Sequence, residues 1–171
     1  MSPTSRDSFW TTSFTTLYET RYQELCAEAV VARWQRVDLT VALLVALTAS
    51  TSAVAGWALW SDAGWKIVWV IAAGLAALGS IADNVMTVPR RIKDQEELRR
   101  LFSGLRTSLE TFRQELVLGL DEVQALSRYG KLRERYEDVV SRSHRDIALT
   151  YRLQNRMQDE VDEKMREQII P

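Results

Sequence analysis

The sequence has very little of the residue types that carry most enzyme chemistry. Its 171 residues include one cysteine, Cys26, and one histidine, His144. A zinc cage or a Cys–His catalytic pair needs several such side chains in one place, and these two lie in different regions of the chain. A lone cysteine on an apolar helix stripe is usually a packing residue. We therefore predict no metal, no cofactor and no catalytic site.

Glycine and proline are also scarce, and neither sign of charge is in clear excess. The chain has seven glycines and three prolines, and 22 Lys and Arg residues balance 23 Asp and Glu residues. No glycine-rich phosphate loop follows a strand, and no strand pattern is apparent. A nearly neutral chain is a poor nucleic-acid binder. The sequence therefore predicts an all-α protein that is not an enzyme and binds no nucleic acid.

Charge is almost absent from one long part of the chain. Leu39–Trp60 contains no charged residue, and a second apolar run over 65–88 follows the polar residues SDAG. An α-helix needs about 20 apolar residues to cross the hydrocarbon of a bilayer. We predict a transmembrane hairpin over 38–88, with spans at 39–60 and 65–88. The alternative is a buried helical hairpin in the core of a globular protein.

The flanks of the two spans predict their orientation. Arg33 and Arg36 precede the first span, and Arg90, Arg91 and Lys93 follow the second. Cytoplasmic flanks carry the Lys and Arg excess, so both termini are expected on the cytoplasmic side of a bacterial inner membrane. Indole rings favour the headgroup layer. The predicted interface anchors are the two arginines Arg90 and Arg91 and the tryptophans Trp34, Trp57, Trp60, Trp65 and Trp69.

Small and hydroxyl-bearing residues mark both spans. In lipid, helices associate where small residues let their backbones approach closely. Candidate packing or pore residues are Thr48, Ser52, Gly56, Ala72, Ala76 and Ser80, with Asp83 and Asn84 at the inner end of the second span. These small faces either serve only to pack the two helices of the hairpin against each other, or they face neighbouring protomers or a water-filled lumen. Asp83 either lines a cytoplasmic vestibule, pairs with Arg36 or Arg90, or reaches headgroup water.

The residues before the first span form two segments. Residues 1–16 are rich in Ser and Thr and are predicted to be a disordered start. Residues 17–37 are predicted to form an amphipathic helix that lies on the membrane or packs on the cytoplasmic helices. Its apolar positions are Tyr22, Cys26, Val30, Trp34 and Val37.

Residues 90–171 are predicted to form a cytoplasmic helical domain resembling a coiled coil. One apolar register has an 11-residue period and comprises Leu98, Leu101, Leu105, Leu109, Phe112, Leu116, Leu120 and Val123. A second, more polar register comprises Leu132, Tyr136, Val139, Ser143, Ile147, Tyr151, Gln154, Gln158, Val161 and Met165. We expect Gly130 to end the first helix, so that the chain doubles back as a hairpin. One continuous helix is the alternative.

The layout resembles a known family. The segment ARWQRVD leads into two spans with a short outer loop, and PRRIKDQEELRRLFSGLRTSLETF follows the membrane directly. Over residues 17–125 this architecture resembles the SLATT-type two-span membrane effectors of bacterial, nucleotide-signalled antiphage defence. The resemblance implies a pore-forming effector controlled by a partner protein or a nucleotide. Residues 126–171 contain no recognisable nucleotide-binding module.

These observations lead to a functional expectation with one main alternative. We expect a homo-oligomer in the lipid bilayer that permeabilises or depolarises the membrane when triggered. The alternative is a non-catalytic anchor or scaffold that presents a cytoplasmic coiled coil to partners. A holin-like phage lysis protein fits less well because the cytoplasmic part is large.

Overall fold

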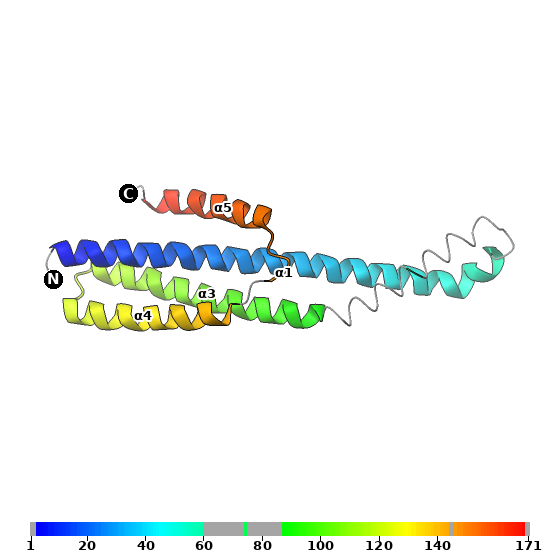
Figure 1. The fold of residues 1–171 in the computed structure, drawn as a ribbon, viewed down its shortest axis with the longest axis horizontal. Helices are drawn as coiled ribbons and strands as arrows, with labels where there is room; N and C mark the ends of the chain where they lie inside the picture. The colour runs from blue at the N-terminus through cyan, green and yellow to red at the C-terminus, as the bar shows by residue number, and fades with distance from the viewer. Residues whose placement is uncertain (1–2, 60–73, 75–86, 144–145, 170–171) are drawn as a thin grey trace. The chain divides into compact units, whose positions relative to one another are not determined.

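The computed structural model describes residues 3–59, 74, 87–143 and 146–169, and over these residues the chain is α-helical without strands. The helices are α1 (Pro3–Leu59), α3 (Val88–Val117), α4 (Glu122–Arg142) and α5 (Tyr151–Ile169), as Figure 1 shows. The predicted all-α fold is therefore confirmed for the described residues.

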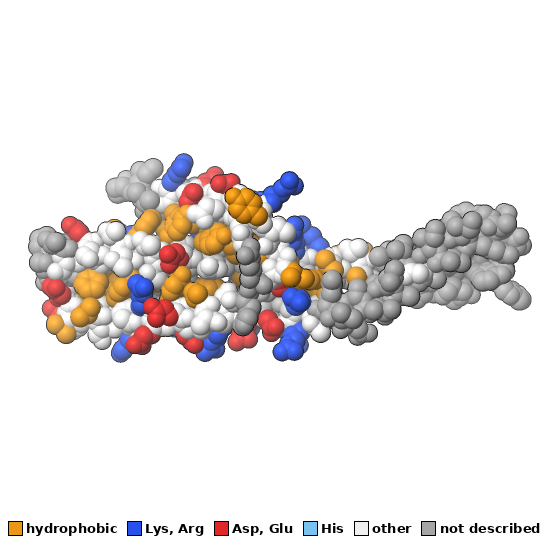
Figure 2. All heavy atoms as spheres, in the orientation of Figure 1, with side chains coloured by type: hydrophobic (Ala, Val, Ile, Leu, Met, Phe, Trp, Pro, Cys, Tyr) orange, Lys and Arg blue, Asp and Glu red, His pale blue; other side chains and the backbone are white. Residues whose placement is uncertain are grey.

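The chain divides into two compact units. One unit contains Met1–Val31 and Asp94–Pro171, and the other contains Ala32–Lys93. In the first unit, which we call the bundle, α5 runs along one side of α1, while α3 and α4 run along the other (Figure 1). Acidic and basic side chains are interspersed over the visible face of the bundle (Figure 2).

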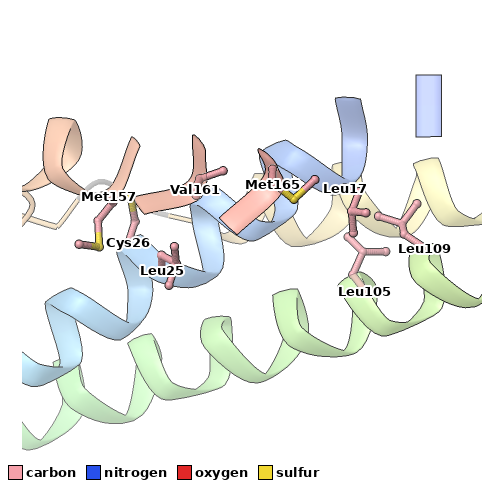
Figure 3. Close-up of a cluster of buried hydrophobic side chains, with 8 residues drawn as sticks. All are labelled: Leu17, Leu25, Cys26, Leu105, Leu109, Met157, Val161 and Met165. Atoms are coloured by element: carbon pink, nitrogen blue, oxygen red, sulfur yellow. The ribbon is translucent and has the colours of Figure 1, made fainter. Parts of the chain in front are cut away.

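The bundle core contains side chains from all four helices. Its largest cluster joins Leu17, Leu25 and Cys26 of α1, Leu105 and Leu109 of α3, and Met157, Val161 and Met165 of α5 (Figure 3). Leu132 and Tyr136 of α4 pack against this cluster. The register predicted for α3 is confirmed in part. Five of its positions are buried, namely Leu98, Leu105, Leu109, Phe112 and Leu116. Leu101 and Leu120 are only partly buried, and Val123, which lies on α4, is exposed.

The start of α1 corrects the prediction of a disordered N-terminal segment. Helix α1 begins at Pro3, and Ser13 and Thr16 are buried. The hydroxyl groups of Thr12, Thr16 and Thr20 donate to the carbonyl four residues earlier, at 2.8, 3.1 and 2.7 Å. Because these hydroxyls are satisfied within the helix, a segment rich in Ser and Thr can be both helical and buried.

The predicted amphipathic helix over 17–37 is confirmed as part of α1. Cys26, Val30 and Trp34 are buried, whereas Val37 is exposed. This segment was expected either to lie on the membrane or to pack on the other helices. The part of it that belongs to the bundle packs on the other helices.

The turn after α3 lies eleven residues before the predicted one. Gly119 has a φ of 95°, and its N–H donates to the carbonyl of Leu116 at 3.4 Å, while the N–H of Leu120 donates to that of Glu115 at 3.1 Å. This pair of bonds is a Schellman motif, which ends a helix. Asp121 then caps α4 by accepting from the N–H of Val123 at 3.2 Å. Gly130, the predicted turn residue, lies inside α4.

A second break divides the predicted C-terminal helix into α4 and α5. The Asp146 carboxylate accepts from the N–H of Ala148 at 2.7 Å, and its carbonyl accepts from the N–H of Leu149 at 3.0 Å. Residues 90–171 are therefore neither one hairpin nor one continuous helix. The break also shifts the helical phase, so that Ile147 and Tyr151 of the predicted register are exposed.

Among the described residues, no helix combines the length and the apolar character needed to cross a bilayer.

The structure describes the two predicted spans to different extents. The first lies on α1 up to Leu59, where the backbone is helical. The second lies outside the described residues except for Gly74, Thr87 and Val88.

Candidate functional site

A buried carboxylate of α1 is paired with arginines of α1 and α3. The Glu24 side chain is 9% exposed, and its Oε2 accepts from Nη1 of Arg21 at 2.7 Å and from Nε of Arg106 at 2.9 Å. Arg106 also donates through Nη1 to Glu110 at 2.9 Å. Burial acts to lower the pKa of Arg106, but Glu24 and Glu110 together raise it above its ordinary value. Arg106 is therefore a permanent cation that links α1 to α3.

Tyrosines connect α1 to α4 and α5. The Tyr18 hydroxyl donates to Asp162 of α5 and accepts from the amide of Gln158. The Tyr136 hydroxyl of α4 donates to Glu19 at 3.0 Å. The pKa of each tyrosine is raised to about 12, first by burial and then by its carboxylate partner. Both hydroxyls are therefore protonated donors over the whole neutral range.

A further buried bond joins the N-terminal turns of α1 to α4. The Thr16 hydroxyl and the Tyr129 hydroxyl lie 2.9 Å apart, and Tyr129 also donates to the carbonyl of Thr12 at 3.3 Å. The Tyr129 ring stacks on Phe112 of α3 at a centroid distance of 5.8 Å. This contact joins three helices at one point.

Arg113 of α3 packs against aromatic rings of α1. Its guanidinium carbon lies 4.0 Å from the ring centroid of Trp10 and 5.1 Å from that of Phe14. Its Nε is buried and has no hydrogen-bond partner in the described chain. Burial lowers the pKa of Arg113, opposed by Glu110. The two rings stabilise the cation in place of a hydrogen-bond acceptor.

One cavity of about 210 Å³ lies in the bundle between α1, α3 and the connection from α4 to α5. It is lined by Gln23, Cys26, Ala27 and Val30 of α1, Gln95, Leu98 and Phe102 of α3, and Ser143, Asp146 and Leu149 of the connection. Burial raises the pKa of the Cys26 thiol, an effect opposed by its hydrogen bond with Tyr22. The thiol is therefore protonated at neutral pH and is a weak nucleophile.

Most of the predicted pore and packing residues, and most of the tryptophans predicted as interface anchors, lie outside the described residues. Thr48, Ser52, Gly56 and Trp57 lie on the helical backbone of α1. The others lie outside the described residues: Trp60, Trp65, Trp69, Ala72, Ala76, Ser80, Asp83 and Asn84. Their predicted roles stay predictions.

Trp34 on α1 and Arg90 and Arg91 at the start of α3 are the predicted interface anchors whose side chains the structure describes. Trp34 is 5% exposed, and the guanidinium carbon of Arg91 lies 5.5 Å from its ring centroid. Arg90 is exposed, and its N–H donates to the carbonyl of Thr87 at 2.9 Å. The burial of Trp34 gives this indole a packing role, and its role at a membrane interface stays a prediction.

Over the described part of the chain, no three His, Cys, Asp or Glu side chains are grouped so as to hold a metal ion. His144 lies outside the described residues. Sequence reasoning missed the Glu24 pair and the cavity, because both depend on which faces of α1 and α3 meet. No family model, curated protein or solved structure matches this chain.

Proposed function

We propose that the chain is an oligomeric inner-membrane effector that permeabilises or depolarises a bacterial membrane when triggered. One observation carries the membrane part of this proposal. On α1, Leu39 is 61% exposed and Leu43 is 55% exposed, and no charged residue follows them before Asp62. Large apolar side chains that protein does not cover mark contacts with lipid or with another protein.

The helical bundle supplies the control element of the proposed mechanism. Helix α1 is continuous from Pro3 to Leu59, so the same helix contributes to the bundle core and to the first predicted span. In the resting state, Arg106, Tyr129 and Tyr136 hold α1 against α3 and α4. A trigger that changes this packing would shift α1, and the small faces around Ser52 and Ala76 would then assemble into a leak.

The biological setting of the proposal comes from the resemblance to two-span effectors of antiphage defence. In that setting, the trigger is a regulatory partner protein or a nucleotide signal. Opening of the leak would arrest or kill the infected cell.

Membrane potential during induced expression in bacteria tests the proposal. Wild type is compared with Ser52→Leu and Asp83→Leu at equal membrane levels, using a voltage-sensitive dye. Depolarisation by wild type that both substitutions abolish would support the leak. The experiment is repeated with neighbouring genes co-expressed and under phage challenge, which supplies the trigger. An intact potential under all these conditions would overturn the proposal.

A scaffold is the second candidate function, and one surface favours it. Around the turn between α3 and α4, four large apolar side chains are exposed: Val117 of α3, Leu118 of the turn, and Val123 and Leu126 of α4. A scaffold would use this end of the bundle to hold a partner. It predicts that Thr48→Leu, Ser52→Leu and Asp83→Leu all leave function intact, whereas the effector predicts that they relieve toxicity.

A further inference from the structure

Helix α5 is held in the bundle by a narrow apolar stripe. Over residues 151–166, the buried side chains of this helix are Met157, Val161 and Met165, which follow one another at intervals of four residues. The bundle part of α3 buries twice as many hydrophobic side chains: Leu98, Phe102, Leu105, Leu109, Phe112 and Leu116. An element with few buried apolar contacts opens more readily than the rest of a protein.

The contact between α5 and α1 is built from adaptable groups. Two of the three buried side chains are methionines, whose flexible thioethers fit irregular surfaces and are common where a protein exchanges its partner. Met157 lies toward Cys26 of α1, and Met165 lies toward Leu17 at the other end of the stripe (Figure 3). Two polar side chains of α5, Gln158 and Asp162, bond to one hydroxyl of α1, that of Tyr18. One apolar stripe and one shared hydroxyl therefore join the two helices.

The other three helices have contacts of their own that do not include α5. Two further core clusters contain only side chains of α1, α3, α4 and the turn between α3 and α4: Phe9, Leu98, Leu101, Phe102, Phe112, Leu116, Leu120, Ala125, Tyr129, Leu132 and Val139. Glu24 of α1 pairs with Arg106 of α3, and Thr16 of α1 bonds to Tyr129 of α4. Removal of α5 leaves this packing and these bonds in place.

We propose that α5 is a detachable helix, which leaves α1 as one unit while α1, α3 and α4 stay folded together. Its release uncovers the side of α1 that carries Tyr18 and Cys26. Because α1 continues without a break to Leu59, a signal that acts on α5 changes the surface of a helix that extends beyond the bundle. The inference concerns the bundle and does not depend on the membrane activity proposed above.

The single cysteine reports on the release of α5. Cys26 is 3% exposed and is the only thiol in the chain. The full-length chain in detergent is treated with 5,5′-dithiobis(2-nitrobenzoic acid), and the absorbance of the released thionitrobenzoate gives the rate of labelling. When opening and closing are fast relative to labelling, this rate is proportional to the population of the open form.

Two truncations of buried side chains provide the first comparison. Met165→Ala weakens the α5 stripe at the end away from Cys26, so it acts on Cys26 only through movement of the whole helix (Figure 3). It is expected to raise the labelling rate at least about tenfold. Leu116→Ala is the matched control, because it removes a buried side chain from a cluster without α5. It should lower the urea midpoint of unfolding but change the labelling rate by less than about twofold.

Two tyrosine variants make the same comparison with little change in core volume. Tyr18→Phe removes the bonds to Gln158 and Asp162 and should raise the labelling rate about tenfold. Tyr136→Phe removes the bond between α4 and Glu19 of α1 and should leave the rate unchanged. This pair also tests the proposal if Met165→Ala fails to fold.

The dependence of labelling on urea separates release of α5 from global unfolding. Release exposes less surface, so the logarithm of the labelling rate should rise less steeply with urea than the global unfolding equilibrium does. Equal slopes would overturn the proposal, because Cys26 would then be exposed only when the whole bundle unfolds. Equal acceleration by Met165→Ala and Leu116→Ala would also overturn it. Unchanged labelling in both Met165→Ala and Tyr18→Phe would show that α5 does not control access to Cys26.

Discussion

The two halves of α1 belong to one helix but have opposite patterns of burial. In the bundle half, the polar residues Ser13, Thr20 and Glu24 are buried. In the half that follows Trp34, Leu39 and Leu43 are exposed. A buried polar residue and an exposed large apolar residue are the informative cases in a burial pattern. The comparison indicates that α3, α4 and α5 supply the surroundings of the first half, and it supports lipid as the surroundings of the second.

The largest expected effect comes from equal truncations in the two halves. Leu17→Ala should lower the free energy of unfolding of the bundle by about 2–5 kcal/mol, because Leu17 is 2% exposed within the core cluster. Leu39→Ala should change it by less than about 0.5 kcal/mol. Denaturant unfolding followed by circular dichroism measures both. Equal losses would mean that protein covers Leu39 as well as Leu17.

A smaller effect is expected from the charge pair between Glu24 and Arg106 in the bundle half. Arg106→Met leaves Glu24 with Arg21 alone and should cost about 1–3 kcal/mol of bundle stability. Arg133→Met removes an exposed pair with Glu137 and should leave the stability of the bundle almost unchanged, because water screens such a pair. The same unfolding measurement separates them. A similar cost for both variants would show that the Glu24 pair has no special role.

Removing a hydroxyl group from each half of α1 should produce a still smaller difference in the stability of the bundle. Thr16→Val removes a buried bond to Tyr129 and should cost about 1 kcal/mol. Thr40→Val removes only a bond to the carbonyl of Arg36 in its own helix and should be close to neutral for the bundle. Thermal unfolding of the two variants tests the difference. If Thr16→Val leaves the stability unchanged, the bond between Thr16 and Tyr129 does not stabilise the contact between α1, α3 and α4.

The smallest effect expected is a change in alkaline stability. The pKa of Tyr18 is raised from 10 to about 12, first by burial and then by Asp162, so the folded state favours the protonated hydroxyl. Its contribution to stability is fully present below pH 10 and is lost as the pH rises through about 12. Tyr18→Phe should therefore reduce the loss of stability between pH 10 and 12. Unfolding midpoints across this range, with tyrosinate absorbance as the titration readout, check the direction. An unchanged loss would exclude Tyr18 as its source.

The sequence predicted those parts of the fold that depend on local periodicity. The 11-residue period of α3 placed Leu105, Leu109 and Leu116 correctly but missed Phe102, and the stripe through Cys26, Val30 and Trp34 predicted an inward face of α1. Such patterns are readable because one face of a helix recurs at fixed spacing.

The errors came from features that depend on tertiary partners or on one local conformation. Gly119 and Gly130 are equally able to end a helix, and the Asp121 cap two residues after Gly119 decides between them. Residues 3–16 have a composition typical of disorder, but Tyr129 of α4 packs on them and bonds Thr16. The cavity beside Gln95 could not be predicted, because three separate elements form it.

The most direct test of the account is the environment of Leu43 in a bilayer. Cys26→Ser provides a cysteine-free chain, and Leu43→Cys and Thr11→Cys each place one spin label on an exposed position of α1. The full chain is reconstituted in lipid vesicles, and collisions of each label with molecular oxygen and with a water-soluble nickel chelate are compared. The account predicts that oxygen dominates at position 43 and the nickel chelate at position 11. Nickel collisions at position 43 as frequent as those at position 11 would contradict it.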